Sequence, residues 1–524
     1  MNRIKVKSEH IYTIVTLALA VVFCVLLWIH IDVNVRHYNV EMDADIASEA
    51  ILSRDLYDNG FVTPDTWYAS TANRIISAPN IAAFFYPVTG ENMNLSMGIG
   101  CSVIMVLLFL VMFLYFRQIK FSWLEAFVAG ILVLSLSDVK TENQSILFLW
   151  AAYYASHIIT IYVISMIYNL ALKKKKIPII LWLVSIGLAV LNSMQGRHGS
   201  LFCYVPLLGV EILRRVCLLL CGKRNIFNNL QVVAWLVVTN IVAWFGSNVF
   251  GSYNMGASRN IRHAGEKFVS QVWPALGSVV NVKLLPVLVW GVVACAVAGY
   301  VVTFVMLVKD KTFDTEDDSE GDESYYLWST LSHVASLALW VLSGTFTTAE
   351  VAPRYFIIEL FIVGVGAALF VRKYGRNAGI CVGVVVTVLG IMASRYYFRT
   401  LIVGDDHQNS DEYKVVCWMQ DNGYEYGYAT FDFANMITVY GNDSVKVRAV
   451  NSMSEVEGCK WLTDSDWYPP VKDASGETCY IVTEHTEPEF TVWMDGNHVE
   501  ALENTQVGKF IIYVLDHDYT LWER

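Results

Sequence analysis

Long apolar segments recur along most of the chain and dominate its pattern of hydrophobic and polar positions. Each runs for about 17 residues or more, long enough to cross a hydrocarbon core roughly 30 Å thick. The pattern predicts about eleven membrane-spanning helices, near residues 11–31, 95–116, 121–137, 145–170, 177–193, 199–215, 228–250, 284–307, 326–344, 354–371 and 378–394. The expected fold class is therefore an all-α polytopic membrane bundle.

The first apolar segment follows Arg3, Lys5 and Lys7, as the apolar part of a signal peptide would. Its apolar run is longer than the roughly 7–15 residues of a signal peptide, and no small-residue cleavage site follows it. We therefore interpret residues 11–31 as a membrane anchor that is kept.

Lys and Arg gather at alternate ends of the predicted spans, and this bias indicates how the chain is oriented. Positively charged short loops are typical of the cytoplasmic side of a membrane. With eleven spans, all the basic clusters fall on one side: Arg3/Lys5/Lys7, Arg117/Lys120, Lys173–Lys176, Arg214/Arg215/Lys223/Arg224, Lys309/Lys311 and Arg372/Lys373/Arg376. We therefore expect a cytoplasmic N-terminus and an outer location for residues from about 395 onward.

Three segments on the predicted outer side are too long to be simple connections: residues 32–94, 251–283 and 401–524. The first contains a predicted helix over Asp43–Asp58, followed by turn signals. In the third, short β-branched and aromatic runs alternate with turn signals, which predicts strands near 435–440, 445–450, 480–483 and 509–515. We expect a transmembrane domain over 1–400 and a small soluble α/β domain over 401–524.

Composition supports a membrane protein. The chain is 55% hydrophobic and 16% charged, whereas soluble domains carry about 25% charged residues. Much of the formal charge of −11 comes from the acidic run 310–323 and the C-terminal domain, and nothing in it suggests nucleic-acid binding. Cys459 and Cys479 lie in the outer domain, and the sequence leaves open whether they form a disulfide.

Candidate chemistry collects at the outer ends of the spans. Asp43, Asp45 and Glu49 lie in the first outer loop, where Asp45 and Glu49 would share one helix face. Cations and a tyrosine follow at three later outer positions: Lys140, Arg197, His198, Arg354 and Tyr355. Such cations can hold the phosphate of a lipid, and a nearby carboxylate can take a proton from an attacking hydroxyl. Together these groups suit glycosyl transfer from a lipid-linked donor.

A simpler interpretation applies to each of these residues alone. Charged side chains belong at span ends, where they meet water. Arg197 and Arg354 are less easily explained in this way, because cations are disfavoured in short outer loops. Arg259 and Arg262, at helical spacing with His263 and Lys267, could contact anionic headgroups or bind a donor phosphate.

The chain resembles the GT-C superfamily of membrane glycosyltransferases, which use polyprenyl-phosphate sugars on the outer side of the membrane. The resemblance rests on Glu41-Met-Asp-Ala-Asp45 after the first span, the helix beginning at Ile46, the motif Thr63-Pro-Asp-Thr-Trp-Tyr68 and the later Arg354-Tyr355. The segment 422–429, followed by Trp461 and Trp467-Tyr468, is similar to the outer domain of uncharacterised bacterial members.

The resemblance implies a carboxylate of the first outer loop as base or metal ligand. Asp43 or Asp45 holds the matching position, and we favour Asp45 as the base. The adjacent Asp-Glu pair of better-known members is absent, so a requirement for a divalent cation (Mg or Mn) stays open. Trp67 and Tyr68 are candidate acceptor contacts, since aromatic rings stack on sugars, although core packing would also explain aromatic residues here.

The sequence therefore predicts an inverting glycosyltransferase, moving a hexosyl or pentosyl group, in a bacterial plasma membrane. Its partners would be a polyprenyl-phosphate-linked sugar, an acceptor glycan or cell-envelope polymer, and membrane lipid. The main alternative is a transporter or flippase for a lipid-linked or anionic substrate, but such proteins tend to show internal repeats and broken helices, and no repeat is evident. A non-catalytic partner in envelope assembly is a third interpretation.

Overall fold

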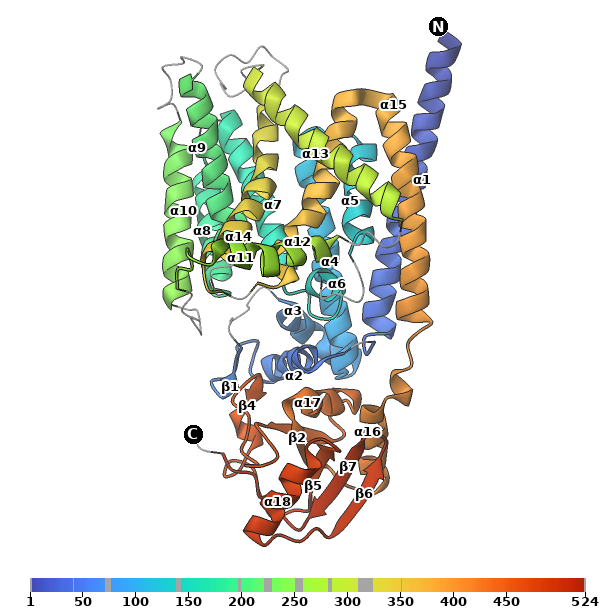
Figure 1. The fold of residues 1–524 in the computed structure, drawn as a ribbon, viewed down its shortest axis with the longest axis vertical. Coiled ribbons are helices and arrows are strands. Elements are labelled where there is room, and N and C mark those ends of the chain that lie inside the picture. Colours follow the sequence, from blue (N-terminus) through green and yellow to red (C-terminus); the bar gives the residue numbers. More distant parts are fainter. Residues whose placement is uncertain are drawn as a thin grey trace.

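A computed structural model shows a tall bundle of helices with a smaller α/β unit at one end (Figure 1). It describes residues 2–40, 42–70, 77–137, 143–174, 176–196, 199–220, 229–249, 258–280, 285–309, 324–349 and 351–522. Within these residues, seven helical segments are long and apolar enough to cross a membrane, and the helices at 123–135 and 179–193 are apolar but shorter.

The helices of the bundle follow the predicted spans in order. They are α1 (Asn2–Arg36), α4 (Met93–Gln118), α5 (Trp123–Ser135), α7 (Ala155–Lys174), α8 (Ile179–Ser193), α9 (Val205–Leu220), α10 (Leu230–Val249), α13 (Pro286–Lys309), α14 (Leu331–Phe346) and α15 (Ile358–Tyr397). The last two predicted spans are the two arms of α15, which meet at Gly375 (φ 77°, ψ −160°). That left-handed backbone favours glycine, because other residues meet a steric penalty there.

The prediction of one continuous span over 145–170 is wrong. A short helix, α6 (Asn143–Leu147), is followed by an irregular stretch, and α7 begins only at Ala155. Asn34 of α1 explains the break, because its side-chain amide donates to the Phe148 carbonyl at 2.9 Å and its oxygen accepts from the Trp150 N–H at 3.2 Å. These backbone groups thus bond to α1 instead of continuing a helix.

The C-terminal α/β unit is built on a five-stranded sheet of order β3-β2-β5-β7-β6. Its elements are α16 (Asp411–Asp421), β2 (Tyr426–Thr430), α17 (Phe431–Tyr440), β3 (Lys446–Val450), β5 (Thr478–Thr483), α18 (Glu487–Asn497), β6 (Glu503–Val507) and β7 (Phe510–Leu515). Strand β2 is parallel to β3 and β5, and β7 is antiparallel to β5 and β6. Alternate side chains pack against α16 and α17 on one face and α18 on the other.

The predicted mixed α/β unit is confirmed, with corrections. The runs at 445–450, 480–483 and 509–515 form β3, β5 and β7, but the strand predicted at 435–440 is wrong, because these residues belong to helix α17. A connection between parallel strands needs a crossover, usually a helix, and α17 connects β2 to β3. Cys459 and Cys479 are both free thiols, so no bridge joins them.

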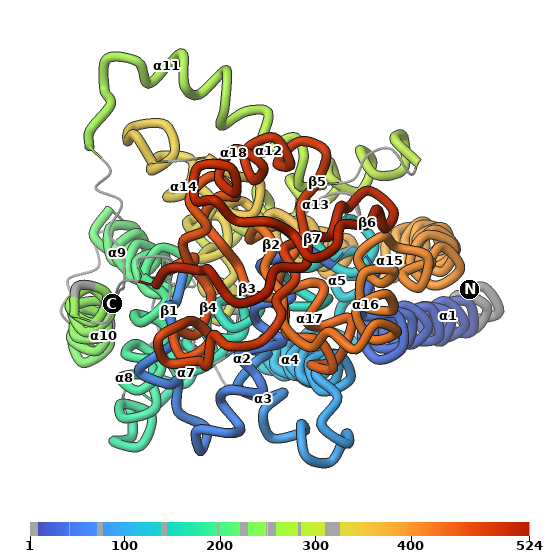
Figure 2. The backbone as a smooth tube through the Cα atoms, turned by 90° about the horizontal axis from the view of Figure 1, so that it is seen from below, coloured from blue at the N-terminus to red at the C-terminus, as the bar shows by residue number. Residues whose placement is uncertain are grey.

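The loop after α1 lies between the bundle and the α/β unit (Figure 1). It contains α2 (Ala44–Asp58), β1 (Trp67–Tyr68) and α3 (Ala78–Phe85). Helix α2 confirms the helix predicted over 43–58 and packs against α17. Strand β1 pairs antiparallel with β4 (Thr463–Asp464) of the α/β unit. Viewed from below, the sheet covers the middle of the bundle (Figure 2).

Candidate active site

Helix α2 presents the predicted carboxylates at its N-terminal end. Asp43 is the N-cap, and its side chain accepts a hydrogen bond from the Ile46 N–H at 2.8 Å. Asp45, in the first turn, is exposed. Glu49, one turn later, is only 4% exposed. The helix N-terminus favours negative charge, so Asp43 and Asp45 sit where an ionised carboxylate is stabilised.

Tyr38 lies beside these carboxylates at the end of α1. Its hydroxyl donates to the Trp150 carbonyl at 3.3 Å. Burial raises the pKa of Tyr38 well above its usual range, and the nearby groups of Tyr153, Glu49 and Asp43 raise it further. The phenol therefore stays protonated and acts as a hydrogen-bond donor.

One face of α1 holds the segment between α5 and α7. His30 and Asn34 are four residues apart, so they lie on one side of the helix, and Tyr38 follows in the turn after α1. Gln144 Nε2 lies 2.8 Å from His30 Nε2, and Asn34 and Tyr38 bond to the backbone at 148–150. This network fixes the segment that precedes α7 and carries Tyr153 and Tyr154.

Arg354 lies beside a group of packed aromatic rings. The Tyr355 ring stacks on Trp340 with centroids 5.1 Å apart, and Trp340 contacts Phe202, also at 5.1 Å. The Arg354 guanidinium carbon lies 5.6 Å from the centre of the Tyr355 ring. Both residues belong to the 3-10 turn η5 (Pro353–Phe356), which lies beside α6. Segment 143–154 therefore contacts η5 through α6 and Tyr38 through the carbonyl of Trp150.

The segment with Arg259 and Arg262 runs at the periphery of the bundle near α11 (Ala264–Lys267) (Figure 2). The predicted helical spacing is wrong for 259–263, because Arg259 forms a β-bridge with Thr347 and the helix starts only at Ala264. Both arginines are exposed. Lys267 is buried, and its ammonium donates to the carbonyls of Thr347 and Ala349 at 2.7 and 2.5 Å. It fastens this segment to the end of α14.

Trp67 and Tyr68 lie where the first loop meets the α/β unit. Trp67 is opposite Asp464 and Tyr68 opposite Thr463 in the β1–β4 pair. Trp67 is buried, and the ring of Tyr68 meets that of Trp522 edge-on at 5.5 Å. Both rings take part in packing this contact, and their role toward an acceptor stays a prediction.

Three predicted phosphate contacts, Lys140, Arg197 and His198, lie outside the described residues. Within the described part of the chain, no group of three or more His, Cys, Asp or Glu side chains could hold a metal ion. The structure thus brings Asp43 and Glu49 close to Tyr38, and Arg354 close to α6, at one end of the bundle.

Sequence reasoning did not single out the charged residues at the other end of α2. Arg54 and Asp55 lie there, facing Asp443 and Arg448 of the α/β unit across a cavity. A signal was present in the segment Lys446-Val-Arg-Ala-Val450, because strand alternation places Lys446 and Arg448 on one face. It did not indicate what that face meets.

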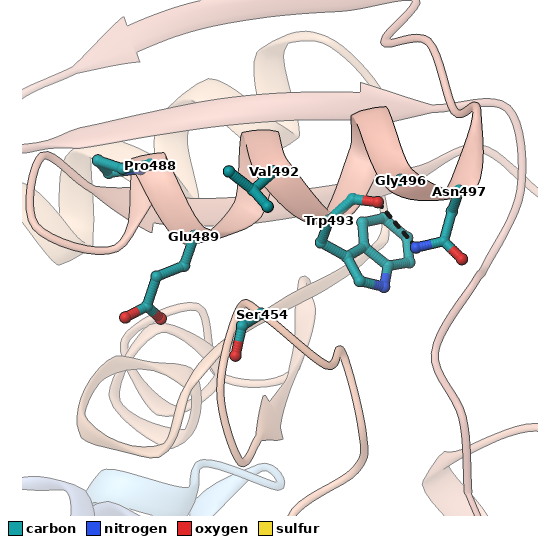
Figure 3. Close-up of a pocket in the computed structure, with 7 residues that line it drawn as sticks. All are labelled: Ser454, Pro488, Glu489, Val492, Trp493, Gly496 and Asn497. Carbon is teal, nitrogen blue, oxygen red and sulfur yellow. Dashed lines mark hydrogen bonds between the residues drawn. The ribbon is translucent and has the colours of Figure 1, made fainter.

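A second cavity, of about 530 Å³, lies along α18 (Figure 3). Pro488, Val492 and Trp493 line it, Glu489 is the one charged residue of its lining, and Asn497 donates to the Trp493 carbonyl at 2.7 Å. Helix α18 lies on the part of the α/β unit away from the bundle (Figure 1). This cavity is therefore remote from the end of the bundle where the predicted residues gather.

No protein-family model and no curated protein matches the chain. Among solved structures, ArnT from Cupriavidus metallidurans in the apo state matches with a TM-score of 0.54 and 11% identity, over 95% of this chain and 97% of that chain. The Archaeoglobus fulgidus oligosaccharyltransferase matches in a complex with Zn and sulfate (TM-score 0.44, 11% identity, 91% of this chain and 70% of that chain). Its apo form gives a TM-score of 0.46 at 9% identity, over 91% of this chain and 71% of that chain.

The likeness to ArnT extends over nearly the whole of both chains and establishes the fold. The chain is a multi-pass membrane protein with an ArnT-like fold, and the predicted helical membrane bundle with a small C-terminal α/β unit is confirmed.

Proposed function

We propose that the protein is a membrane glycosyltransferase that moves a sugar from a polyprenyl-phosphate donor to an acceptor glycan or cell-envelope polymer. The observation that supports it most is the ArnT-like fold over 95% of the chain, which agrees with the resemblance of its sequence to the GT-C superfamily. The carboxylates of α2 and the cation of η5 approach one end of the bundle. We place this end and the α/β unit on the outer side of the membrane, following the distribution of Lys and Arg.

The proposed reaction is a single displacement with inversion. The Asp45 carboxylate takes the proton of an acceptor hydroxyl, whose oxygen attacks the anomeric carbon of the donor sugar. The bond from that carbon to the phosphate oxygen breaks, and polyprenyl phosphate leaves with the electron pair. Arg354 stabilises the negative charge that grows on the phosphate, with Lys140, Arg197 and His198 as further candidates.

Asp45 is favoured over its neighbours as the base. Asp43 already accepts the N-cap hydrogen bond of α2, and Glu49 is buried. Asp45 is exposed in the first helical turn, where an acceptor hydroxyl can reach it.

A transfer assay tests the base. The protein, in bilayer discs, is given a labelled polyprenyl-phosphate sugar and a glycan acceptor, and the release of polyprenyl phosphate is followed. We expect Asp45→Asn to slow release by about 10²–10⁴, whereas Asp65→Asn, at an exposed carboxylate of the same loop, leaves it unchanged. Full activity after replacement of both Asp43 and Asp45 would rule out the proposed base, and transport of the donor without release would favour a flippase.

The role of Arg354 has a separate test. Arg354→Gln should lower kcat by about 10²–10³, the size seen when one donor to a developing negative charge is removed. Lys414→Gln, at an exposed cation paired with Asp411 on α16, is the control and should leave kcat nearly unchanged. A change in KM alone for Arg354→Gln would show that Arg354 only binds substrate in its ground state.

A further inference from the structure

A charged cavity of about 520 Å³ lies between the C-terminal end of α2 and the α/β unit. Its volume falls within the roughly 300–1,000 Å³ of small-molecule sites. Such sites are usually lined by apolar groups, but carboxylates and cations of both segments line this one, including Asp55, Arg448 and Asp464. The lining therefore suits a polar ligand.

Arg54 joins the two walls of the cavity. Its Nη2 lies 2.9 Å from Asp55 Oδ1, and its Nη1 lies 2.6 Å from Asp443 Oδ1. Asp55 belongs to α2, and Asp443 follows α17 in the α/β unit. This ion pair fixes the width of the cavity and neutralises the charge of Arg54.

Arg448 differs from Arg54, because its guanidinium has an unused donor. The residue is 6% exposed, and its guanidinium carbon lies 3.2 Å from the centre of the Trp467 ring. Its Nη1 has no hydrogen-bond partner among the described residues. Burial, and then the nearby charge of Arg54, lowers the pKa of Arg448 to about 10, so the group is still charged at neutral pH. A buried donor without a partner is costly, and a ligand oxygen would remove that cost.

Asp55 supplies an unused acceptor in the same cavity. It is 7% exposed, and its Oδ2 has no hydrogen-bond partner among the residues that the structure describes. Burial raises the pKa of Asp55 to about 6, against the opposing effect of Arg54. The carboxyl is therefore mostly ionised at neutral pH. The guanidinium carbons of Arg54 and Arg448 lie 5.1 and 3.2 Å from the centre of the Trp467 ring. Because Asp55 is paired with Arg54, the unused acceptor of Asp55 and the unused donor of Arg448 are close together.

We propose that this cavity binds one saccharide unit through its hydroxyl groups, with Arg448 donating to a sugar oxygen and Asp55 accepting from a hydroxyl. A hydroxyl both donates and accepts, so neighbouring hydroxyls of a sugar satisfy both protein groups. An inorganic anion would satisfy Arg448 but would meet the carboxylates of Asp55, Asp443 and Asp464 in the same cavity.

The geometry of α2 indicates which part of a glycan binds here; this step rests on the proposed function. Asp55 follows Asp45 by ten positions in one helix, which is about 15 Å along the axis. Reacting atoms must approach to about 3–3.5 Å, so a sugar at Asp55 is not the one that reacts at Asp45. The bound unit is then an internal residue of an acceptor oligosaccharide.

Direct binding tests the site without any transfer reaction. Methyl glycosides of glucose, mannose, galactose and N-acetylglucosamine are titrated into the protein in zwitterionic bilayer discs, because glycoside detergents would compete. We expect at least one glycoside to bind and Arg448→Met to weaken it about tenfold or more, the effect of losing a hydrogen bond to a charged group. Arg448→Gln keeps a donor and should lose less. Lys414→Met, a cation paired with Asp411 on α16, is the matched control and should bind normally.

Several outcomes would overturn the proposal. One is that none of the glycosides binds. Another is that Arg448→Met and Arg448→Gln lose equal affinity for the glycoside while the unsubstituted protein, titrated with sulfate, binds it tightly. A third is that Lys414→Met also loses glycoside affinity. Within the described part of the chain, Arg448 is buried without a carboxylate in ion-pair contact, so the thermal midpoint of Arg448→Met should not fall. If that variant nevertheless unfolds, Asp55→Asn repeats the test, with the same expected loss.

Competition identifies the source of the sugar. A free oligosaccharide should displace the glycoside, and a polyprenyl-phosphate sugar should not; the reverse result would assign the cavity to the donor. Glycoside binding without transfer would contradict the proposed enzyme and leave this site standing. Transfer without glycoside binding would contradict this site alone.

Discussion

The two ends of α2 lie in different surroundings. At its N-terminal end, Asp45 is exposed, and the neighbouring polar groups of Asn34 and Tyr38 are hydrogen-bonded to backbone. At its C-terminal end, Arg54 and Asp55 are buried in an ion pair. Donor and acceptor atoms without partners among the described residues also occur there.

These surroundings indicate a different role for each end of α2. Near the N-terminal end, Asn34 and Tyr38 hold the backbone at 148–150 through hydrogen bonds, but buried atoms without partners among the described residues occur there too, such as Gln144 Oε1 and Trp150 Nε1. At the C-terminal end, the unpartnered atoms belong to Asp55 and Arg448, which line a cavity. Buried groups that lack partners cost free energy, which a ligand in that cavity can recover. We therefore infer that the N-terminal end of α2 serves chemistry and the C-terminal end serves binding.

The largest expected effect is a change in kcat for a variant at the N-terminal end of α2, whereas a variant at the C-terminal end should change KM. Asp45→Asn should lower kcat by about 10²–10⁴, the contribution of a general base, with glycoside binding unchanged. Asp55→Asn should raise KM for an oligosaccharide acceptor about tenfold and leave kcat nearly unchanged. Initial rates over a range of acceptor concentrations measure both. If both variants changed the same parameter, the two ends would not have separate roles.

The ion pair across the cavity should dominate stability. Arg54→Leu leaves Asp55 buried without its partner, at a cost of about 3–5 kcal/mol, and should lower the thermal midpoint markedly. The double variant Arg54→Leu/Asp55→Leu removes both charges and should recover most of the loss. Thermal unfolding of the two variants in bilayer discs measures this. A double variant no more stable than Arg54→Leu would show that the ion pair is not the cause.

The pH dependence of stability should follow Asp55. Burial raises the pKa of this carboxyl to about 6, compared with about 3.9 in an unfolded chain. The folded protein thus holds the proton more tightly, and the resulting stability is complete below about pH 4 and lost as pH rises through about 6. The full effect is about 3 kcal/mol, from two pKa units.

Asp55→Asn removes this titration and stays neutral at every pH. Its thermal midpoint should therefore rise relative to that of the unsubstituted protein between pH 4 and pH 7. Asp58→Asn, an exposed carboxylate on the same helix, should show no such trend. A constant difference between Asp55→Asn and the unsubstituted protein across this range would contradict the burial of an ionised Asp55.

The smallest effect concerns the helix cap. Asp43→Ala should destabilise α2 by about 1 kcal/mol through loss of the bond to the Ile46 N–H. Asp43→Asn keeps a capping oxygen and should retain both stability and transfer. Loss of transfer in Asp43→Asn, with an unchanged thermal midpoint, would make Asp43 the base.

Local features of the fold could be predicted where sequence patterns are strong. Apolar runs indicated where the long helices lie, and the helix predicted over 43–58, ahead of the turn signals, is α2. The errors occurred where distant residues compete with local preference. Asn34 of α1 breaks the apolar run at 148–150, and the β-branched run at 435–440 forms a helix because two parallel strands need a crossover.

The candidate site was predicted unevenly. Asp43, Asp45 and Glu49 lie on one short helix, so their proximity follows from spacing alone. Arg448 is almost 400 positions from Arg54, and only the pairing of β1 with β4 and the packing of α2 against α17 bring them to one cavity. Nothing in the spacing of a sequence encodes such a distance.

Apolar runs and local spacing in the sequence were enough to predict a membrane protein, the positions of its long helices and the carboxylates that begin α2. These properties depend on apolar length and on contacts between near neighbours, which the order of residues specifies directly. The packing of the folded chain sets which charges are buried, which are paired and which donors and acceptors lack partners among the described residues. Burial and electrostatic pairing depend on distances through space, and these exist only once α2 and the α/β unit have packed together.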